Sequence, residues 1–161
     1  MAKFKDTASF INTLNIIYYA MFCGHIIFFF FVYLNKEKEA FFDFQNEDIF
    51  SYVVPLVCVA EVAMAYFLFP IRLKDAIKQE TLSKKMEGFL SASLIKWAIL
   101  EGGALFSVAV FFITANKMYA AWYGFMALVF VLNRNDARHL VSLLKLNKTE
   151  EKIVRENLPL E

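Results

Sequence analysis

Four long apolar stretches, separated by polar and charged segments, dominate the pattern of the chain. They are Ile11–Leu34, Ile49–Ile71, Leu94–Ala115 and Met118–Leu132. A helix needs about 20 apolar residues to cross a bilayer, and a backbone in lipid must satisfy its own hydrogen bonds. The fourth stretch is short unless Thr114–Lys117 is a tight turn and the helix extends to Asn133. The pattern predicts an all-α integral membrane protein, a four-helix bundle within residues 1–134.

The polar segments predict further helices. Leu73–Gly88 can extend the second span as a stalk or an elbow, with Gly88 as the expected break. In the tail, residues 135–161, Asn135 or Asp136 can cap an amphipathic helix with one apolar face, formed by Ala137, Leu140, Val141 and Leu144. This helix either lies on the membrane surface or packs against the bundle.

A second helix is predicted to start at Asn147. Glu150 stands three residues later, which is the spacing of a capping box.

Lysine and arginine are distributed unevenly between the two sides of the predicted spans. The N-terminus, the Arg72–Ser93 segment and the tail contain most of them, whereas Asn35–Asp48 is acidic. Basic loops face the cytoplasm. The asymmetry therefore predicts that both termini and the middle loop are cytoplasmic.

Three predicted spans each contain one ionisable residue near their midpoint: His25, Glu61 and Glu101. Ionisable residues at that depth usually face the bundle interior and pair with one another. These three could share a proton, form a His⁺–Glu⁻ pair or bind a cation. Alternatively, each could hydrogen-bond a neighbouring helix and only stabilise the bundle.

Gly102 and Gly103 directly follow Glu101. Glycines in a span allow another helix or a ligand to approach closely, or they simply permit tight packing. Both interpretations place an interface at Glu101.

Composition narrows the classes of function. Apolar residues make up 59% of the 161 residues and the net charge is +1, against about 45–50% apolar residues in soluble domains. The sequence lacks the basic stripe with interleaved aromatic residues that is typical of nucleic-acid binding. It also lacks phosphate-binding, metalloprotease and nucleophile-elbow motifs. We expect no cofactor and no metal. Cys23 and Cys58 are expected to be buried free thiols, unless their spans meet at that depth and form a disulfide.

The stretch SLIKWAILEGGALFSVAV resembles the second helix of rotary ATP synthase c subunits, through Glu101, Gly102 and the run Ala104–Phe106. That resemblance implies ion binding by Glu101. The partner helix, however, is not glycine-rich, and the loop lacks the family's Arg-Gln-Pro turn. The whole chain resembles a group of small, uncharacterised bacterial four-span membrane proteins, through this third span, the Thr114–Asn116 turn and the Leu144–Glu151 tail. The second resemblance implies the architecture and a bacterial inner-membrane location.

Three functional hypotheses follow. The first is an accessory or scaffold subunit of a larger inner-membrane complex, with protein partners or further copies of itself. The second is a proton- or cation-handling protein that uses Glu101, Glu61 and His25. The third, an enzyme acting on lipid or quinone, lacks a recognisable set of catalytic residues.

Overall fold

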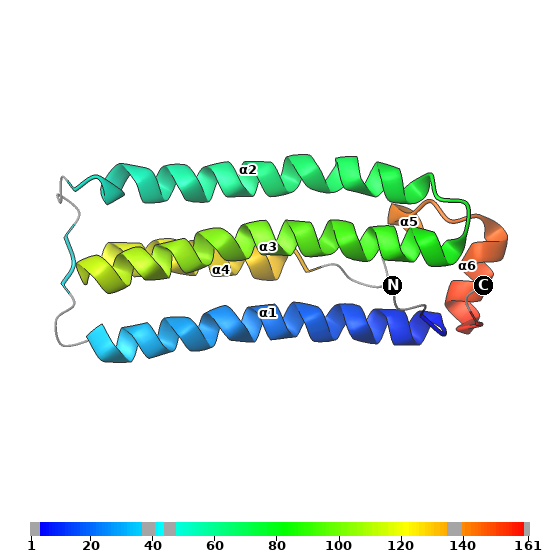
Figure 1. The fold of residues 1–161 in the computed structure, drawn as a ribbon, viewed down its shortest axis with the longest axis horizontal. Helices are drawn as coiled ribbons and strands as arrows, with labels where there is room; N and C mark the ends of the chain where they lie inside the picture. Colours follow the sequence, from blue (N-terminus) through cyan, green and yellow to red (C-terminus); the bar gives the residue numbers. More distant parts are fainter. Residues whose placement is uncertain (1–3, 37–40, 44–47, 135–139, 160–161) are drawn as a thin grey trace. The chain divides into compact units, whose positions relative to one another are not determined.

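The computed structural model describes residues 4–36, 41–43, 48–134 and 140–159. These residues form six helices and, apart from two isolated β-bridges, no extended pairing. The helices are α1 (Thr7–Lys36), α2 (Phe50–Ile77), α3 (Leu82–Thr114), α4 (Lys117–Leu132), α5 (Leu140–Leu143) and α6 (Lys148–Glu156) (Figure 1). The predicted all-α class is therefore confirmed.

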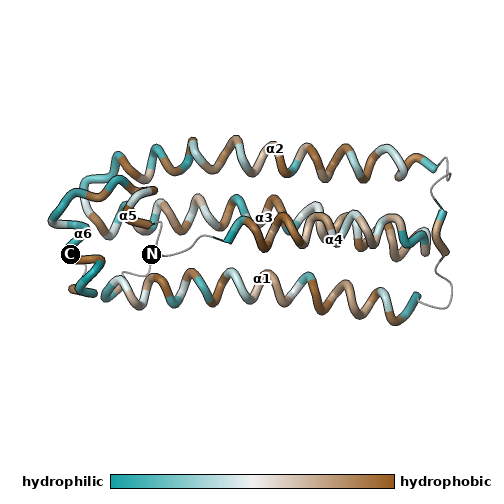
Figure 2. Tube along the Cα trace, turned by 180° about the vertical axis from the view of Figure 1, so that it is seen from behind, coloured by the Kyte–Doolittle hydropathy of each residue, from teal (hydrophilic) through white to brown (hydrophobic). Residues whose placement is uncertain are grey.

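Three of the helices, α1, α2 and α3, are long and apolar enough to cross a membrane. The fourth apolar helix, α4, has 16 residues and ends at its C-cap Asn133. Figure 2 shows the brown, apolar lengths of α1 to α4 and the teal, polar residues that gather in the last turns of α2, the first turns of α3 and α6. The apolar stretches of the sequence thus all fold as helices.

Short polar side chains set the starts of the apolar helices. The carboxylate of Asp6 accepts from the Ser9 N–H at 2.7 Å, and that of Asp48 accepts from the Ser51 N–H at 2.9 Å. Both bonds satisfy a first-turn donor that has no partner within its own helix. The asparagine at 116 does the same for α4, accepting from the Met118 N–H at 3.0 Å.

The predicted tight turn between α3 and α4 is confirmed. Ala115 has a φ of 56°, in the left-handed region, which reverses the chain immediately after Thr114. The turn also binds the segment that follows α1: Phe41 donates to the Ala115 carbonyl at 3.1 Å and accepts from the Lys117 N–H at 2.8 Å. These bonds satisfy backbone groups that a turn otherwise leaves open.

The chain divides into two compact units. The first comprises Met1–Tyr19, Tyr66–Lys96 and Arg134–Glu161, and the second comprises Ala20–Ala65 and Trp97–Asn133. The helices α1, α2 and α3 contribute residues to both units. The core of the first unit includes Phe10, Met86, Phe89, Leu140 and Leu144, all at most 1% exposed.

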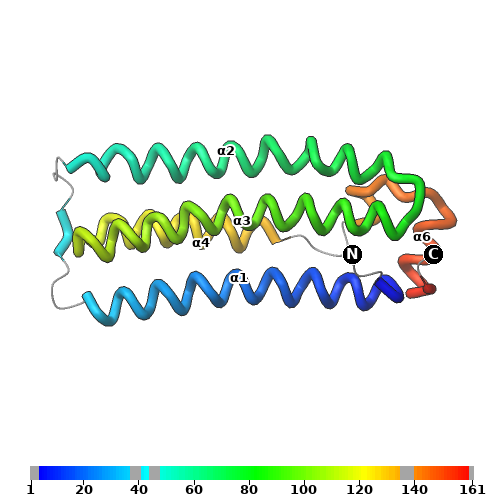
Figure 3. Tube along the Cα trace, in the orientation of Figure 1, coloured from blue at the N-terminus to red at the C-terminus, as the bar shows by residue number. Residues whose placement is uncertain are grey.

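In the first unit the tail is joined to the starts of α1 and α3. The side chain of Asn157 accepts from the Ala8 N–H at 2.7 Å, and Lys85 of α3 forms an ion pair with Glu150 at 2.7 Å. Figure 3 shows the tail, in orange and red, beside the blue start of α1 and the green start of α3. The tail therefore packs against the first turns of α1 and α3 within the first unit.

One prediction for this unit was wrong. Gly88 does not break a helix but lies inside α3, which begins six residues earlier at Leu82. A Cβ at position 88 would lie 2.7 Å from the Cβ of Ala76 in α2. The glycine is there because the two helices approach each other closely, and this contact outweighs its low helix propensity.

The predicted tail helices have different outcomes. Asn147 and Glu150 form the predicted capping box at the start of α6, with reciprocal hydrogen bonds of 2.9 and 3.0 Å. The predicted cap at Asn135 or Asp136 lies outside the described residues, as does Ala137. Of the remaining predicted face, Leu140 and Leu144 are buried, and α5 itself has only four residues.

The second unit contains the C-terminal half of α1, the N-terminal half of α2, the C-terminal half of α3 and all of α4. Its core includes Val54, Leu100, Phe111, Met126 and Phe130, all fully buried. Both cysteines belong to this unit and both are free. Cys58 is buried as expected, whereas the expectation of burial was wrong for Cys23, which is exposed.

Candidate functional site

The carboxylate of Glu61 in α2 lies against Gly102 and Gly103 of α3, inside the second unit. A Cβ at Gly102 would be 3.2 Å from Glu61 Oε1, and a Cβ at Gly103 would overlap Oε2. Since a glycine leaves room that any other residue would fill, the pair of glycines accommodates this carboxylate. The sequence linked these glycines with access to Glu101, and the structure places Glu61 against them.

The environment of Glu61 is unusual for a carboxylate. Its Oε2 is buried and has no hydrogen-bond partner among the described residues. Burying a charged oxygen without a donor is strongly unfavourable, and a proton or a cation on the carboxylate removes that penalty. The site is therefore suited to hold one or the other.

The polar character of this contact continues for one turn along both helices. Cys58 precedes Glu61 by three residues in α2, and Ser107 follows Gly103 by four in α3, so each pair shares a helix face. Ser107 Oγ lies 3.4 Å from Cys58 Sγ and donates to the Gly103 carbonyl at 2.8 Å. Ser107 was not expected at this site, although its spacing of four residues from Gly103 was the signal in the sequence.

Glu101 has different surroundings. Its side chain is half-buried, and within the described residues it has no hydrogen-bond or ion-pair partner. Because residues two apart in a helix lie on nearly opposite faces, Glu101 projects away from the face on which Gly103 meets Glu61. Glu61 and Glu101 consequently form no hydrogen bond in the described chain.

His25 lies fully buried in the second unit among three aromatic rings. The rings of Phe22, Tyr123 and Phe130 are 5.3–5.8 Å from the imidazole, centroid to centroid, each at a steep angle. His25 Nδ1 lies 3.1 Å from the Tyr123 hydroxyl, and Nε2 has no partner among the described residues. One nitrogen is thus satisfied by α4, and neither glutamate reaches the ring.

Tyr123 was not expected as a partner of His25. It stands four residues after Tyr119 in α4, and the Tyr119 hydroxyl donates to Asp48 at 2.7 Å. A pair of tyrosines at this spacing in an apolar helix places two hydroxyls on one face. That spacing was the signal in the sequence, since a buried tyrosine hydroxyl normally has a partner.

The three predicted ionisable residues therefore do not form one cluster. Among the described residues, no group of three or more His, Cys, Asp or Glu side chains could hold a metal ion. The geometry instead defines two separate features, the Glu61–Gly103 contact and the His25–Tyr123 pair. Each can hold a proton at a defined atom, and only the first has an unpartnered carboxylate oxygen.

Comparison of the chain with protein-family models, with curated proteins and with solved structures finds no match in any of the three. The resemblances noted in the sequence consequently stay predictions.

Proposed function

We propose that the chain is a four-span bundle in a bacterial inner membrane, with both termini and the α2–α3 connection on the cytoplasmic side. Three helices long enough to cross a bilayer support this proposal, as does the shorter α4. Of the 18 most apolar consecutive residues in each helix, only 17% are buried by the rest of the chain in α1 and in α2, against 44% in α3. Lipid or another subunit accounts for apolar surface of this extent.

We propose further that the protein is an accessory subunit of a larger membrane complex. The observation that supports this most is the half-buried Glu101, which has no partner within the described residues. An ionisable group in a membrane span normally faces protein and pairs with a polar group. The partner of Glu101 is then a side chain of another subunit, packed on the face of α3 that the chain leaves open.

The test is purification of the tagged full-length chain in a mild detergent, followed by mass spectrometry of what remains bound. A stoichiometric partner is the expected result. Glu101→Gln should retain it, because an amide still hydrogen-bonds, whereas Glu101→Leu should release it. Glu80→Leu makes the same change on the exposed connection between α2 and α3, and it should release nothing.

A chain that purifies alone would contradict the accessory role. So would a partner that Glu101→Leu and Glu80→Leu release equally.

A second candidate function is the handling of protons or cations, and the buried, unpartnered Oε2 of Glu61 favours it. A single carboxylate at the middle of a span can load and release one ion if a path reaches it. Liposomes that contain the purified protein should then show proton or sodium flux. Glu61→Gln should abolish that flux while the variant still folds, and a wild-type protein without flux contradicts this candidate.

A further inference from the structure

A charged cleft of about 400 Å³ lies in the first unit, where α2 ends and α3 begins. Each helix lines it with one cation and one carboxylate three residues apart: Arg72 and Asp75 on α2, Lys84 and Glu87 on α3. Residues at this spacing share a helix face, so all four charges border the same space. The volume lies within the range of small-ligand sites.

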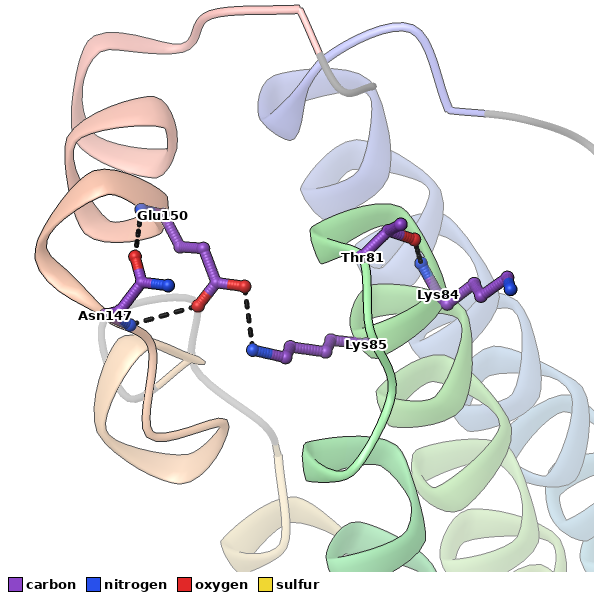
Figure 4. Close-up of polar contacts among 5 residues, drawn as sticks. All are labelled: Thr81, Lys84, Lys85, Asn147 and Glu150. Carbon is purple, nitrogen blue, oxygen red and sulfur yellow. Dashed lines mark hydrogen bonds and ion pairs between the residues drawn. The ribbon is translucent and has the colours of Figure 1, made fainter.

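None of these four side chains forms an ion pair with any described residue. The neighbouring Lys85 behaves differently. Figure 4 shows Lys85 reaching toward Glu150 of α6, whereas Lys84 projects away from it. Two positive and two negative groups thus border one cleft without neutralising one another, which suits a ligand that has both charges.

The contact between Ala76 and Gly88 fixes which residues of α2 and α3 lie at the same level, and so it gives the sequence of charges along the cleft. The two antiparallel helices meet at this point, where a Cβ on the glycine would lie 2.7 Å from the Ala76 Cβ. Arg72 is therefore level with Ser91, next to the apolar length of α2 that ends at Ile71. Asp75 lies three residues farther from that apolar length, about 5 Å along the helix axis.

Glu87 lies near the level of Asp75, on the other helix. Lys84 lies beyond both, at the outer rim of the cleft.

A phospholipid headgroup has charges in the order that matches the cleft, in which the cation Arg72 lies nearest the apolar length of α2 and the carboxylates of Asp75 and Glu87 lie farther out. Its phosphate lies next to the acyl region, and the amine of phosphatidylethanolamine lies farther out. We propose that the cleft binds this headgroup, with Arg72 and the Ser91 hydroxyl on the phosphate and with Asp75 and Glu87 accepting from the ammonium group. The choice of ethanolamine follows from hydrogen bonding, because its ammonium has N–H donors and the quaternary amine of choline has none.

This inference rests on the proposed membrane location, which is tested separately. Membranes that contain the full-length protein are washed with alkaline carbonate, and an integral protein stays in the pellet. If the chain is released, the membrane proposal fails and the lipid site fails with it. If the chain is retained, the next experiment tests the cleft alone.

The full-length protein in detergent is mixed with equal amounts of phosphatidylethanolamine, phosphatidylcholine and phosphatidylglycerol with identical acyl chains. Native mass spectrometry then counts the lipids that remain bound. Phosphatidylethanolamine should be retained about tenfold over phosphatidylcholine, which corresponds to about 1.4 kcal/mol, the size expected of one hydrogen bond to a charged group. Glu87→Gln should remove most of this preference. Arg72→Gln should instead lower the retention of all three lipids, because they share the phosphate that Arg72 is proposed to bind.

Matched controls are Lys74→Gln and Glu80→Gln, which remove exposed charges from the same region outside the cleft lining. They should leave the preference unchanged. Gel filtration shows whether each variant folds. Arg72, Lys74 and Glu80 are exposed and Glu87 is half-buried, so none of the four changes disturbs the core and all four variants are expected to fold.

Three outcomes would overturn the proposal. These are equal retention of the three lipids, equal losses in the cleft and control variants, and displacement of the bound lipid by millimolar inorganic phosphate alone. The last result would identify an anion site rather than a headgroup site.

Discussion

The carboxylate of Glu61 in α2 occupies the space that a side chain at position 103 of α3 would need. A Cβ at Gly103 would overlap Glu61 Oε2 and would lie 2.7 Å from the Cε of Met126 in α4. Met126 is itself fully buried, so its terminal methyl could move only by repacking against its neighbours. A side chain at position 103 would therefore force the side-chain ends of Glu61 and Met126, from two neighbouring helices, to move.

We expect Gly103→Ala to lower the free energy of unfolding by about 1–3 kcal/mol, the usual effect of adding a methyl group to a packed core. Thermal unfolding in detergent measures it. Combining the change with Glu61→Ala should recover part of the loss, because one of the two overlaps disappears.

Gly124→Ala is the matched control, since a Cβ there meets nothing within 4 Å. Alanine is the better helix former, so this variant should be neutral or more stable by up to about 1 kcal/mol. Equal effects of the two substitutions would contradict the proposed packing around Glu61.

The hydrogen bond between His25 and Tyr123 should stabilise the second unit. Tyr123→Phe removes the hydroxyl that lies 3.1 Å from Nδ1 and leaves a fully buried imidazole without a partner. We expect a loss of about 1–3 kcal/mol, the usual penalty for an unsatisfied buried polar group, again measured by unfolding in detergent.

Tyr33→Phe serves as the control for this prediction. The Tyr33 ring stacks on Phe111, and its hydroxyl has no hydrogen bond among the described residues. The control should change stability by only a few tenths of a kcal/mol. A similar loss in both variants would mean that the loss of a tyrosine hydroxyl in general, not of the His25 hydrogen bond, accounts for the effect at Tyr123.

Features that depend on neighbouring residues were predictable from the sequence. The apolar helices follow from long runs of apolar residues, the Asn147–Glu150 capping box from a spacing of three, and the α3–α4 turn from the polar break at Thr114–Lys117. Each of these features is encoded by residues close together in the sequence, so it can be predicted without knowing which helices pack against each other.

Features that depend on helix register were not predictable. Glu61 and Gly103 are 42 positions apart, and only the packing of α2 on α3 brings them together. For the same reason Gly88 suggested a helix break, although its contact with Ala76 keeps it inside α3. A glycine signals close approach as well as a helix end, and the sequence does not say which applies.

The turn between α3 and α4 contains a residue that glycine should improve. Ala115 has a φ of 56°, where a Cβ crowds the backbone. Ala115→Gly should therefore raise the free energy of unfolding by about 0.5–1 kcal/mol. Ala109→Gly makes the same exchange on the exposed side of α3 and should lower it by about 1 kcal/mol. If both variants lose stability, strain at Ala115 is not significant.

The ion pair between Lys85 and Glu150 should make the stability of the first unit depend on pH. Burial by itself would raise the pKa of the Glu150 carboxyl. The Lys85 ammonium and the Asn147 N–H, which both donate to it, outweigh burial and hold its pKa below the usual value.

A carboxyl whose pKa is lower in the folded state binds fewer protons folded than unfolded. Its stabilisation is complete above the unfolded pKa, near 4.3. It is lost as the pH falls through the folded pKa. Glu150→Gln keeps an acceptor for the Asn147 N–H but removes the charge, so it should lower stability at neutral pH by about 1–2 kcal/mol and reduce the loss in acid.

Glu151→Gln breaks the more exposed pair with Arg155 and should change stability by less than about 0.5 kcal/mol. Urea unfolding of both variants and the wild type between neutral and acidic pH gives the comparison. The ion pair would be irrelevant to acid sensitivity if Glu150→Gln and the wild type lost stability in parallel over this range. The Lys85–Glu150 geometry predicts instead that the wild type and Glu150→Gln become equally stable below the folded pKa of Glu150. At that pH the side chain at position 150 is uncharged in both proteins.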